Sequence, residues 1–188
     1  MRIHLRRATI AVAVLAAALS TTVAASSVAQ SPAAACQTPW GTGVKSATGM
    51  HTAPLLTTRT GRHPCYDRLV FEFSGTATGY RVGYASNVFT PGQGVGLRPY
   101  TAGGKLISVL LRNPAYNAQG SATYRHPVGA HVGGVFGFQT FRDVVYGGSF
   151  EGTTVFAVGV RAQLPFRVFH LAGPGAHQRI VLDVAHQG

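Results

Sequence analysis

Hydrophobic and polar residues alternate along much of the chain, which is typical of β-strands that bury one face. The clearest case lies within 61–73, where Leu69, Phe71 and Phe73 are separated by single residues. Pro64 cannot donate a hydrogen bond to a sheet, so we expect this strand to begin after it. Similar strand patterns occur at 80–84, 106–112, 153–161, 166–171 and 179–185, with a shorter apolar stretch at 144–146.

Turn-forming pairs of glycine, proline and asparagine separate these segments. The pairs are Pro91-Gly92, Gly103-Gly104, Asn113-Pro114, Gly147-Gly148 and Pro174-Gly175. Because no long window shows a capped helical period, short strands joined by turns indicate an antiparallel sandwich or barrel. We predict an all-β fold, an antiparallel β-sandwich in a single domain. The stretch 113–139 has no clean period, and such a long excursion is often either functional or mobile.

The first 29 residues have the features of a cleaved secretory signal peptide. Three arginines precede an apolar run at 8–25, and the small residues Ser27 and Ala29 fit cleavage after position 29. A retained membrane anchor is the alternative, because the run is about as long as a minimal membrane-spanning helix. The small polar residues that follow at once favour cleavage and secretion.

Cleavage would leave about 160 residues, which suits one domain with its own core. We place a Pro-, Ala- and Gly-rich N-terminal segment at 30–47 and the β-sandwich domain at 48–188. The N-terminal segment carries Trp40, the only tryptophan, and its composition rarely packs a core by itself. We expect Trp40 to cover an apolar spot on the domain, with a place in the binding site as the alternative.

The only two cysteines are Cys36 and Cys65. In an exported chain a disulfide is the natural expectation, and it would tie the N-terminal segment across the start of the domain. The closed loop of about 30 residues would contribute roughly 3–4 kcal/mol in the chain-entropy description. A free thiol and a metal pair are the alternatives, although the spacing matches no metal motif. A lipid-modified Cys36 is disfavoured because it lies far beyond the apolar run.

Residues that could perform catalysis do not form a known motif. The Gly-x-Ser-x-Gly and Ser-x-x-Lys patterns are absent, and oxidised cysteines cannot serve as thiolates. A glycan hydrolase would need two carboxylates to converge in one cleft. The carboxylates are Asp67, Glu72, Asp143, Glu151 and Asp183. We expect them to form ion pairs with arginines and predict that the chain is not an enzyme, with a secreted glycan or cell-wall hydrolase as the alternative.

Histidines are numerous, but their spacing does not indicate a metal site. The histidines beyond the signal peptide are His51, His63, His126, His131, His170, His177 and His186. None has the spacing of a helical zinc site. We expect scattered surface histidines, no metal and no cofactor.

The chain is strongly basic, with a formal net charge of +11. The arginines are dispersed and no nucleic-acid motif is present, so we expect no nucleic-acid partner. An exported basic protein meets wall phosphates, peptidoglycan carboxylates and anionic lipids, and arginine can bind such groups through two parallel hydrogen bonds. Salt would screen the long-range part of this attraction. The alternative is that the charge only maintains solubility.

Several motifs together resemble the AMIN-like domains of exported actinobacterial proteins. In order, they are 61–63, 66–73, 79–84, 148–152, 164–169 and 179–185. The resemblance covers the chain from about Thr57 to His186. It implies a β-sandwich related to the AMIN modules of periplasmic wall amidases and pilus secretins, which are targeting modules for the cell wall and not the catalytic parts. It provides no catalytic residues to carry over.

These observations predict a secreted, monomeric module that binds peptidoglycan or a wall teichoic polymer. The expected recognition surface comprises Arg62, His63, Tyr66, Asp67, Arg68, Phe150, Glu151 and Arg167. Arginines would bind carboxylates or phosphates, and Tyr66 would present a flat ring to a sugar. The alternative is that the charged members of this set pair with one another and fix turns and sheet ends. A protein-interaction module that uses 113–139 is a further possible function.

Overall fold

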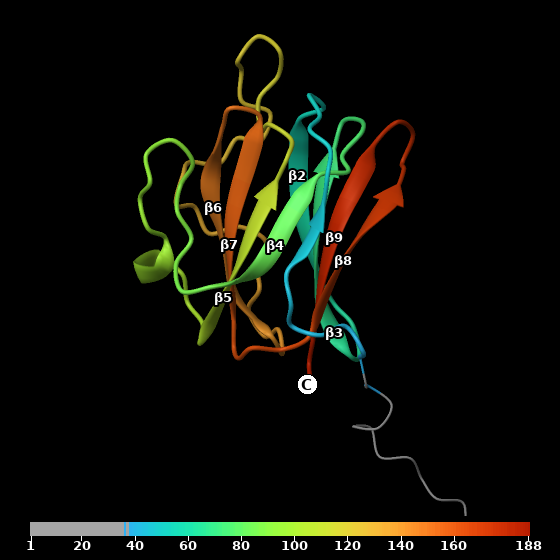
Figure 1. Cartoon of the computed structure of the whole chain (residues 1–188), viewed down its shortest axis with the longest axis vertical. Helices are drawn as coiled ribbons and strands as arrows, with labels where there is room; N and C mark the ends of the chain where they lie inside the picture. The colour runs from blue at the N-terminus through green and yellow to red at the C-terminus, as the bar shows by residue number, and fades with distance from the viewer. Residues whose placement is uncertain (1–35, 37) are drawn as a thin grey trace, which may run out of the picture. The chain divides into compact units, whose positions relative to one another are not determined.

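The computed structural model describes Cys36 and residues 38–188. The predicted signal peptide at 1–29 and most of 30–37 lie outside the described residues. The described chain forms β-strands and one short 3-10 helix (Figure 1). The elements are β1 (Lys45–Ala47), β2 (Leu55–Arg62), β3 (Tyr66–Phe73), β4 (Tyr80–Ala85), η2 (Arg98–Tyr100), β5 (Lys105–Leu111), β6 (Phe141–Phe150), β7 (Thr153–Val160), β8 (Phe166–Ala172) and β9 (Gln178–Ala185).

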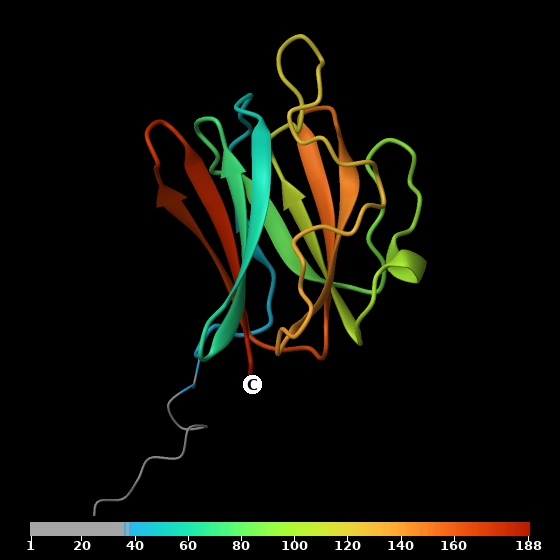
Figure 2. The same ribbon diagram turned by 180° about the vertical axis from the view of Figure 1, so that it is seen from behind.

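Two antiparallel sheets form a sandwich, which confirms the predicted fold class. One sheet has the strand order β1-β4-β5-β7-β6, and the other has the order β2-β3-β9-β8 (Figures 1 and 2). Among the described residues, no helix is long and apolar enough to cross a bilayer.

The core between the sheets follows from the alternation in each strand. In β3, Leu69, Phe71 and Phe73 are fully buried and face the opposite sheet, where Phe71 contacts Phe156 with ring centroids 5.0 Å apart. The intervening residues of β3 therefore lie on the outer face of the four-stranded sheet. This outer face carries the candidate site.

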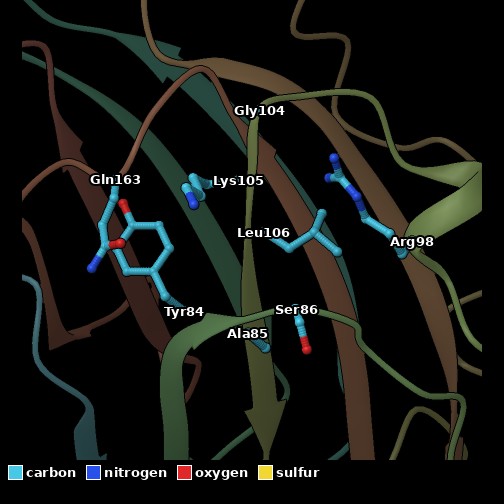
Figure 3. Close-up of a pocket in the computed structure, with 8 residues that line it drawn as sticks. All are labelled: Tyr84, Ala85, Ser86, Arg98, Gly104, Lys105, Leu106 and Gln163. Carbon is cyan, nitrogen blue, oxygen red and sulfur yellow. The ribbon is translucent and has the colours of Figure 1, made fainter.

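A second, smaller apolar cluster lies on the outer face of the five-stranded sheet. The connection between β4 and β5 crosses this face and packs Val88 and Leu97 onto Leu106, Val145 and Ala157. The cover leaves part of β4 and β5 open, where side chains line a surface depression (Figure 3).

The N-terminal part of the domain is more ordered than the sequence indicated. Two strands were not predicted: β1, which pairs with β4, and β2, which pairs with β3. The sequence of β2 does not alternate cleanly because it is an edge strand whose threonines bind the 113–139 stretch; Thr58 contacts the Tyr124 hydroxyl at 2.8 Å. The strand β6 is also longer than the predicted 144–146.

The 113–139 stretch contains no named strand, but it is packed against the sandwich. Tyr124 is buried among core aromatic residues, with its ring centroid 5.0 Å from that of Tyr146. Further along, Val132 donates to the carbonyl of Val144, and Tyr146 donates to that of Ala130. The stretch therefore covers the outer edge of β6.

Candidate binding surface on the four-stranded sheet

Arg68, Asp183 and Arg167 form a row across β3, β9 and β8 on the outer face of the four-stranded sheet. The register pairs Asp183 with Arg68 on one side and with Arg167 on the other. Paired residues of antiparallel strands point to the same side of a sheet. The row is therefore a direct result of strand alternation, with Leu69 and Leu182 turned into the core.

Asp183 is fully buried and accepts hydrogen bonds from both arginines. Arg68 donates to it through Nε at 2.7 Å and Nη2 at 2.9 Å, and Arg167 donates through Nε at 2.9 Å. The hydrogen bond to Asp183 raises the pKa of Arg68, while burial acts in the opposite direction. Two guanidinium groups share one carboxylate, so the row carries one positive charge in excess.

Aromatic rings surround the two guanidinium groups. The guanidinium carbon of Arg167 lies 4.4 Å from the ring centroid of Trp40, and that of Arg68 lies 5.2 Å from that of Tyr66. His63 stacks on Tyr66 with a centroid distance of 4.5 Å. Such contacts hold a cation over a π-face. We call this group the arginine–aromatic platform, and its members are Trp40, His63, Tyr66, Arg68, Arg167, Phe169 and Asp183.

The predicted disulfide is confirmed, and it holds one part of the platform in place. Cys36 and Cys65 are joined with an S–S distance of 2.08 Å, and Cys65 directly precedes β3. Four residues after Cys36, Trp40 meets Tyr66 edge to face at 5.6 Å. The amide of Phe166 then donates to the carbonyl of Gly41, so Trp40 lies between two attachment points.

Sequence reasoning did not include Phe169 or Asp183 in the site, and it gave the site only as the alternative for Trp40. Phe169 and Asp183 share their outward parity with Arg167 and Arg68, so the alternation in β8 and β9 contains a signal for them. Trp40 has no such pattern, because its position depends on the disulfide and on the pairing of β8 with the segment around Gly41.

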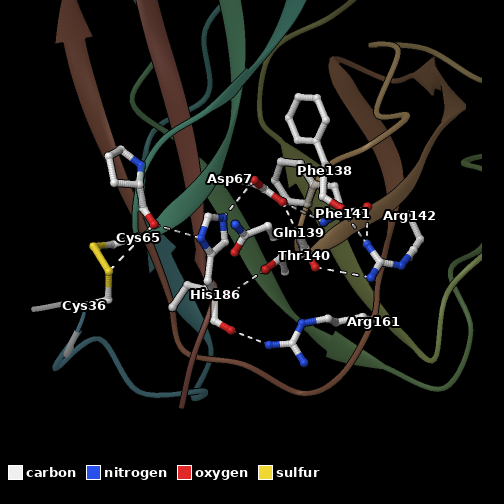
Figure 4. Close-up of polar contacts among 12 residues, drawn as sticks. Cys36, Cys65, Asp67, Phe138, Gln139, Thr140, Phe141, Arg142, Arg161 and His186 are labelled. Carbon is white, nitrogen blue, oxygen red and sulfur yellow. Dashed lines mark hydrogen bonds and ion pairs between the residues drawn. A yellow bond between two sulfur atoms is a disulfide. The ribbon is translucent and has the colours of Figure 1, made fainter. Parts of the chain in front are cut away.

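Asp67 does not belong to an exposed surface, so its predicted role is corrected. It is fully buried, and the amides of Thr140 and Phe141 donate to its Oδ2 at 2.6 and 3.0 Å (Figure 4). His186 Nε2 lies 3.0 Å from Oδ1. The physical reason is the alternation of side chains along β3, which places Asp67 on the same inward face as Leu69. Asp67 therefore fixes the junction of β3, β6 and the end of β9.

His186 is buried as well, which corrects the expectation of surface histidines. Its Nδ1 lies 3.2 Å from the carbonyl of Pro64 and its Nε2 faces Asp67. Both partners are acceptors, so both bonds form only when the ring carries two protons. Arg161 donates to the carbonyl of His186 from the other side (Figure 4).

Arg62, Phe150 and Glu151 are exposed but lie away from the platform. Arg62 pairs with Asp67 and so falls on the other side of the sheet, beside Gly137. Phe150 ends β6, whose first residue, Phe141, contacts Asp67. A ten-residue strand spans about 30 Å. Phe150 and Glu151 therefore lie at the opposite end of the sandwich, and a single surface with all eight predicted residues does not form.

The remaining carboxylates are dispersed. Glu72 binds Arg59 and His177. The hydrogen bond with His177 is the main cause of the lowered pKa of Glu72. Arg59 lowers this pKa further, whereas burial acts to raise it. Asp143 lies 2.9 Å from Nδ1 of His131. Glu151 has no ion pair within the described part of the chain. Residues 36 and 38–188 contain no group of three or more histidine, cysteine or acidic residues that could hold a metal.

The fold is a β-sandwich of two antiparallel sheets, and the platform lies on the outer face of the four-stranded sheet. A family model of the AMIN-like domain matches residues 53–186, which is most of the chain. The chain therefore belongs to the AMIN-like domain family, as the sequence motifs indicated. An AMIN-like domain is a binding or targeting module associated with the cell wall, not a catalytic family. Comparison with curated proteins and with solved structures found no match.

Proposed function

We propose that this protein is a secreted, non-catalytic module that binds peptidoglycan or a wall polyanion through the arginine–aromatic platform. The observation that supports this proposal is the sharing of buried Asp183 by Arg68 and Arg167 beside partly buried aromatic rings. The carboxylate and the rings orient the guanidinium groups before a ligand arrives. Such preorganisation lowers the entropic cost of binding.

The arginines keep donors for a ligand. Asp183 occupies Nε and Nη2 of each guanidinium group, and Nη1 of Arg68 and of Arg167 has no partner among the described residues. The Arg167 side chain is 40 % exposed, compared with 21 % for Arg68, so Arg167 is the more accessible. Peptidoglycan offers stem-peptide carboxylates to these donors.

Co-sedimentation with purified peptidoglycan, with and without teichoic acid and at low and moderate salt, tests the proposal. We expect binding that persists at moderate salt and falls about tenfold in Arg167→Gln, because a charged hydrogen bond contributes roughly 1.5–3 kcal/mol. Trp40→Ala should weaken binding similarly without a change in charge.

Arg125→Gln is the matched control, since Arg125 is an exposed arginine outside the platform. Equal losses in Arg125→Gln and Arg167→Gln would reduce the interaction to general charge attraction. Absence of binding in every condition would reject the proposal.

A protein-interaction role for 113–139 is the second candidate. Phe136 in this stretch is fully exposed and is therefore available to contact a protein partner. Phe136→Ala should abolish capture of a protein partner and leave wall binding unchanged if this role is correct.

A further inference from the structure

Two adjoining depressions lie over β4 and β5, one on the outer face of the five-stranded sheet and the other around the edge where β4 ends and β5 begins. Their volumes are about 370 and 280 Å³, and they share Tyr84 and Ala85. The first is also lined by Ser86, Arg98, Gly104, Lys105, Leu106 and Gln163, and the second by Val44, Arg81, Gly83, Ser108 and Leu110. We call the continuous feature the β4–β5 trough.

The trough exists because its floor is made of small residues and its sides are raised. Gly83 and Ala85 on β4 lie opposite Ser108 and Leu106 on β5. The β4–β5 connection reaches only as far as Leu106 and so forms one side. Val44 forms the other side of the trough. A Cβ atom on residue 83 would come within 2.8 Å of Val44 Cγ2, so the glycine at this position allows Val44 to lie close to β4.

The charge around the trough is of one sign. Arg81, Arg98 and Lys105 are all exposed, and no carboxylate lines either depression. None of the three cations is in an ion pair within 38–188, unlike Arg68 and Arg167. In Figure 3 the side chains of Lys105 and Gln163 lie to one side of β5, and that of Arg98 lies to the other.

The cations are spaced along the trough. Arg81 is four residues from Ala85 on β4, which is roughly 13 Å along a strand. Arg98 and Lys105 lie at the Ala85 end. A small ion would contact only one end of such a feature, whereas an extended chain would reach both ends and could approach the floor at Gly83 and Ser108.

We propose that the β4–β5 trough is a second binding site, which takes a linear polymer with an oxyanion on every repeat. The site lies on the opposite sheet from the arginine–aromatic platform and does not depend on that platform being functional. Repeated phosphates and repeated carboxylates both meet this description, because arginine and lysine bind either group.

Binding of defined polymers tests the trough. The probes are inorganic polyphosphate, polygalacturonate and neutral dextran, followed by calorimetry and by amide shifts of Gly83 and Ser108 in NMR spectra. We expect at least one anionic probe to bind and to shift these amides, and dextran not to bind. The preferred anionic probe identifies the oxyanion as phosphate or carboxylate.

Three variants separate a site from general charge attraction. Arg98→Gln with Lys105→Gln should lower affinity at least about tenfold, compared with less than about twofold for Arg125→Gln. Ser108→Phe fills the floor without a change in charge and keeps a residue type that strands favour, so it should also abolish binding. Arg167→Gln should bind the probe like the unchanged protein, which separates this test from that of the platform.

The proposal fails if neither anionic probe binds, or if dextran binds equally well. It also fails if the double variant and Arg125→Gln lose affinity to the same extent, or if folded Ser108→Phe binds normally.

Discussion

Asp67 and Asp183 are both fully buried and lie on neighbouring strands of the four-stranded sheet, but they face opposite sides of it. Asp67 faces inward and is held by two backbone amides and His186. Asp183 faces outward and is held by two arginine side chains. Backbone amides within a fold cannot turn towards a ligand, whereas each arginine keeps an unused amino group. The donors, and not burial, distinguish a carboxylate that joins strands from one that organises a surface.

The largest expected effect comes from Asp67→Ala. Loss of the carboxylate leaves two buried amides and the ring of His186 without their acceptor. Each buried donor left without a partner costs about 1–3 kcal/mol, so the free energy of unfolding should fall by about 3 kcal/mol or more in urea denaturation. Glu151→Gln, on an exposed turn, is the control and should change it by less than about 0.5 kcal/mol. A loss as small as that of the control would show that Asp67 does not join the strands.

Removing the disulfide should affect both regions at once. Cys36→Ser with Cys65→Ser opens a loop with a sequence separation of 29 residues, and the expected loss of stability is about 3 kcal/mol. Because Trp40 is the only tryptophan, its fluorescence reports on the platform directly. We expect a red shift in the folded variant as Trp40 leaves Arg167. An unchanged spectrum would mean that the bond between Gly41 and Phe166 holds Trp40 without the disulfide.

Asp183→Asn should cost less stability than Asp67→Ala but have more effect on wall binding. The arginines are partly exposed and can turn to water, so we expect a loss of about 1–3 kcal/mol. The change also makes the protein more basic. General charge attraction would therefore strengthen binding to a polyanion, whereas loss of an oriented platform would weaken it. Co-sedimentation of this variant gives opposite results for the two explanations.

Glu72 lies between these two cases, because one arginine and one histidine bind it. Its pKa is lowered in the folded state from an ordinary value of 4.5. The lowered pKa of Glu72 stabilises the folded state at pH values above 4.5, and this stabilisation is lost as the pH falls through the pKa of the folded state. Unfolding midpoints in urea across the acidic range should therefore decline less steeply in Glu72→Gln. An identical decline in the variant and the unchanged protein would contradict the lowered pKa.

The sequence was informative where alternation controls the structure and uninformative where contacts depend on distant segments. The period in β3 and β9 predicted the sandwich, and the same alternation puts Asp183 on one face with Arg179 and Val181. The same parity puts Asp67 on the side of Leu69, so its burial could have been read from the sequence. Trp40 could not be placed, because a disulfide and an edge contact position it.

The error at Phe150 and Glu151 has a different cause. Motifs that lie together in a family pattern do not have to lie together in space, and β6 carries these two residues away from β3. The length and end points of β6 were not evident from the apolar stretch 144–146. Its glycines and the shifted register beside Gly148 interrupt the period.

The packing of 113–139 along β6 has a consequence for aggregation. An uncovered ten-residue edge strand would offer its backbone to a second molecule and could start sheet-to-sheet association. The bonds from Val132 and to Ala130 occupy that backbone. Deletion of the stretch would therefore yield self-associating protein whatever its natural partners are, and single changes such as Phe136→Ala are the informative way to examine it.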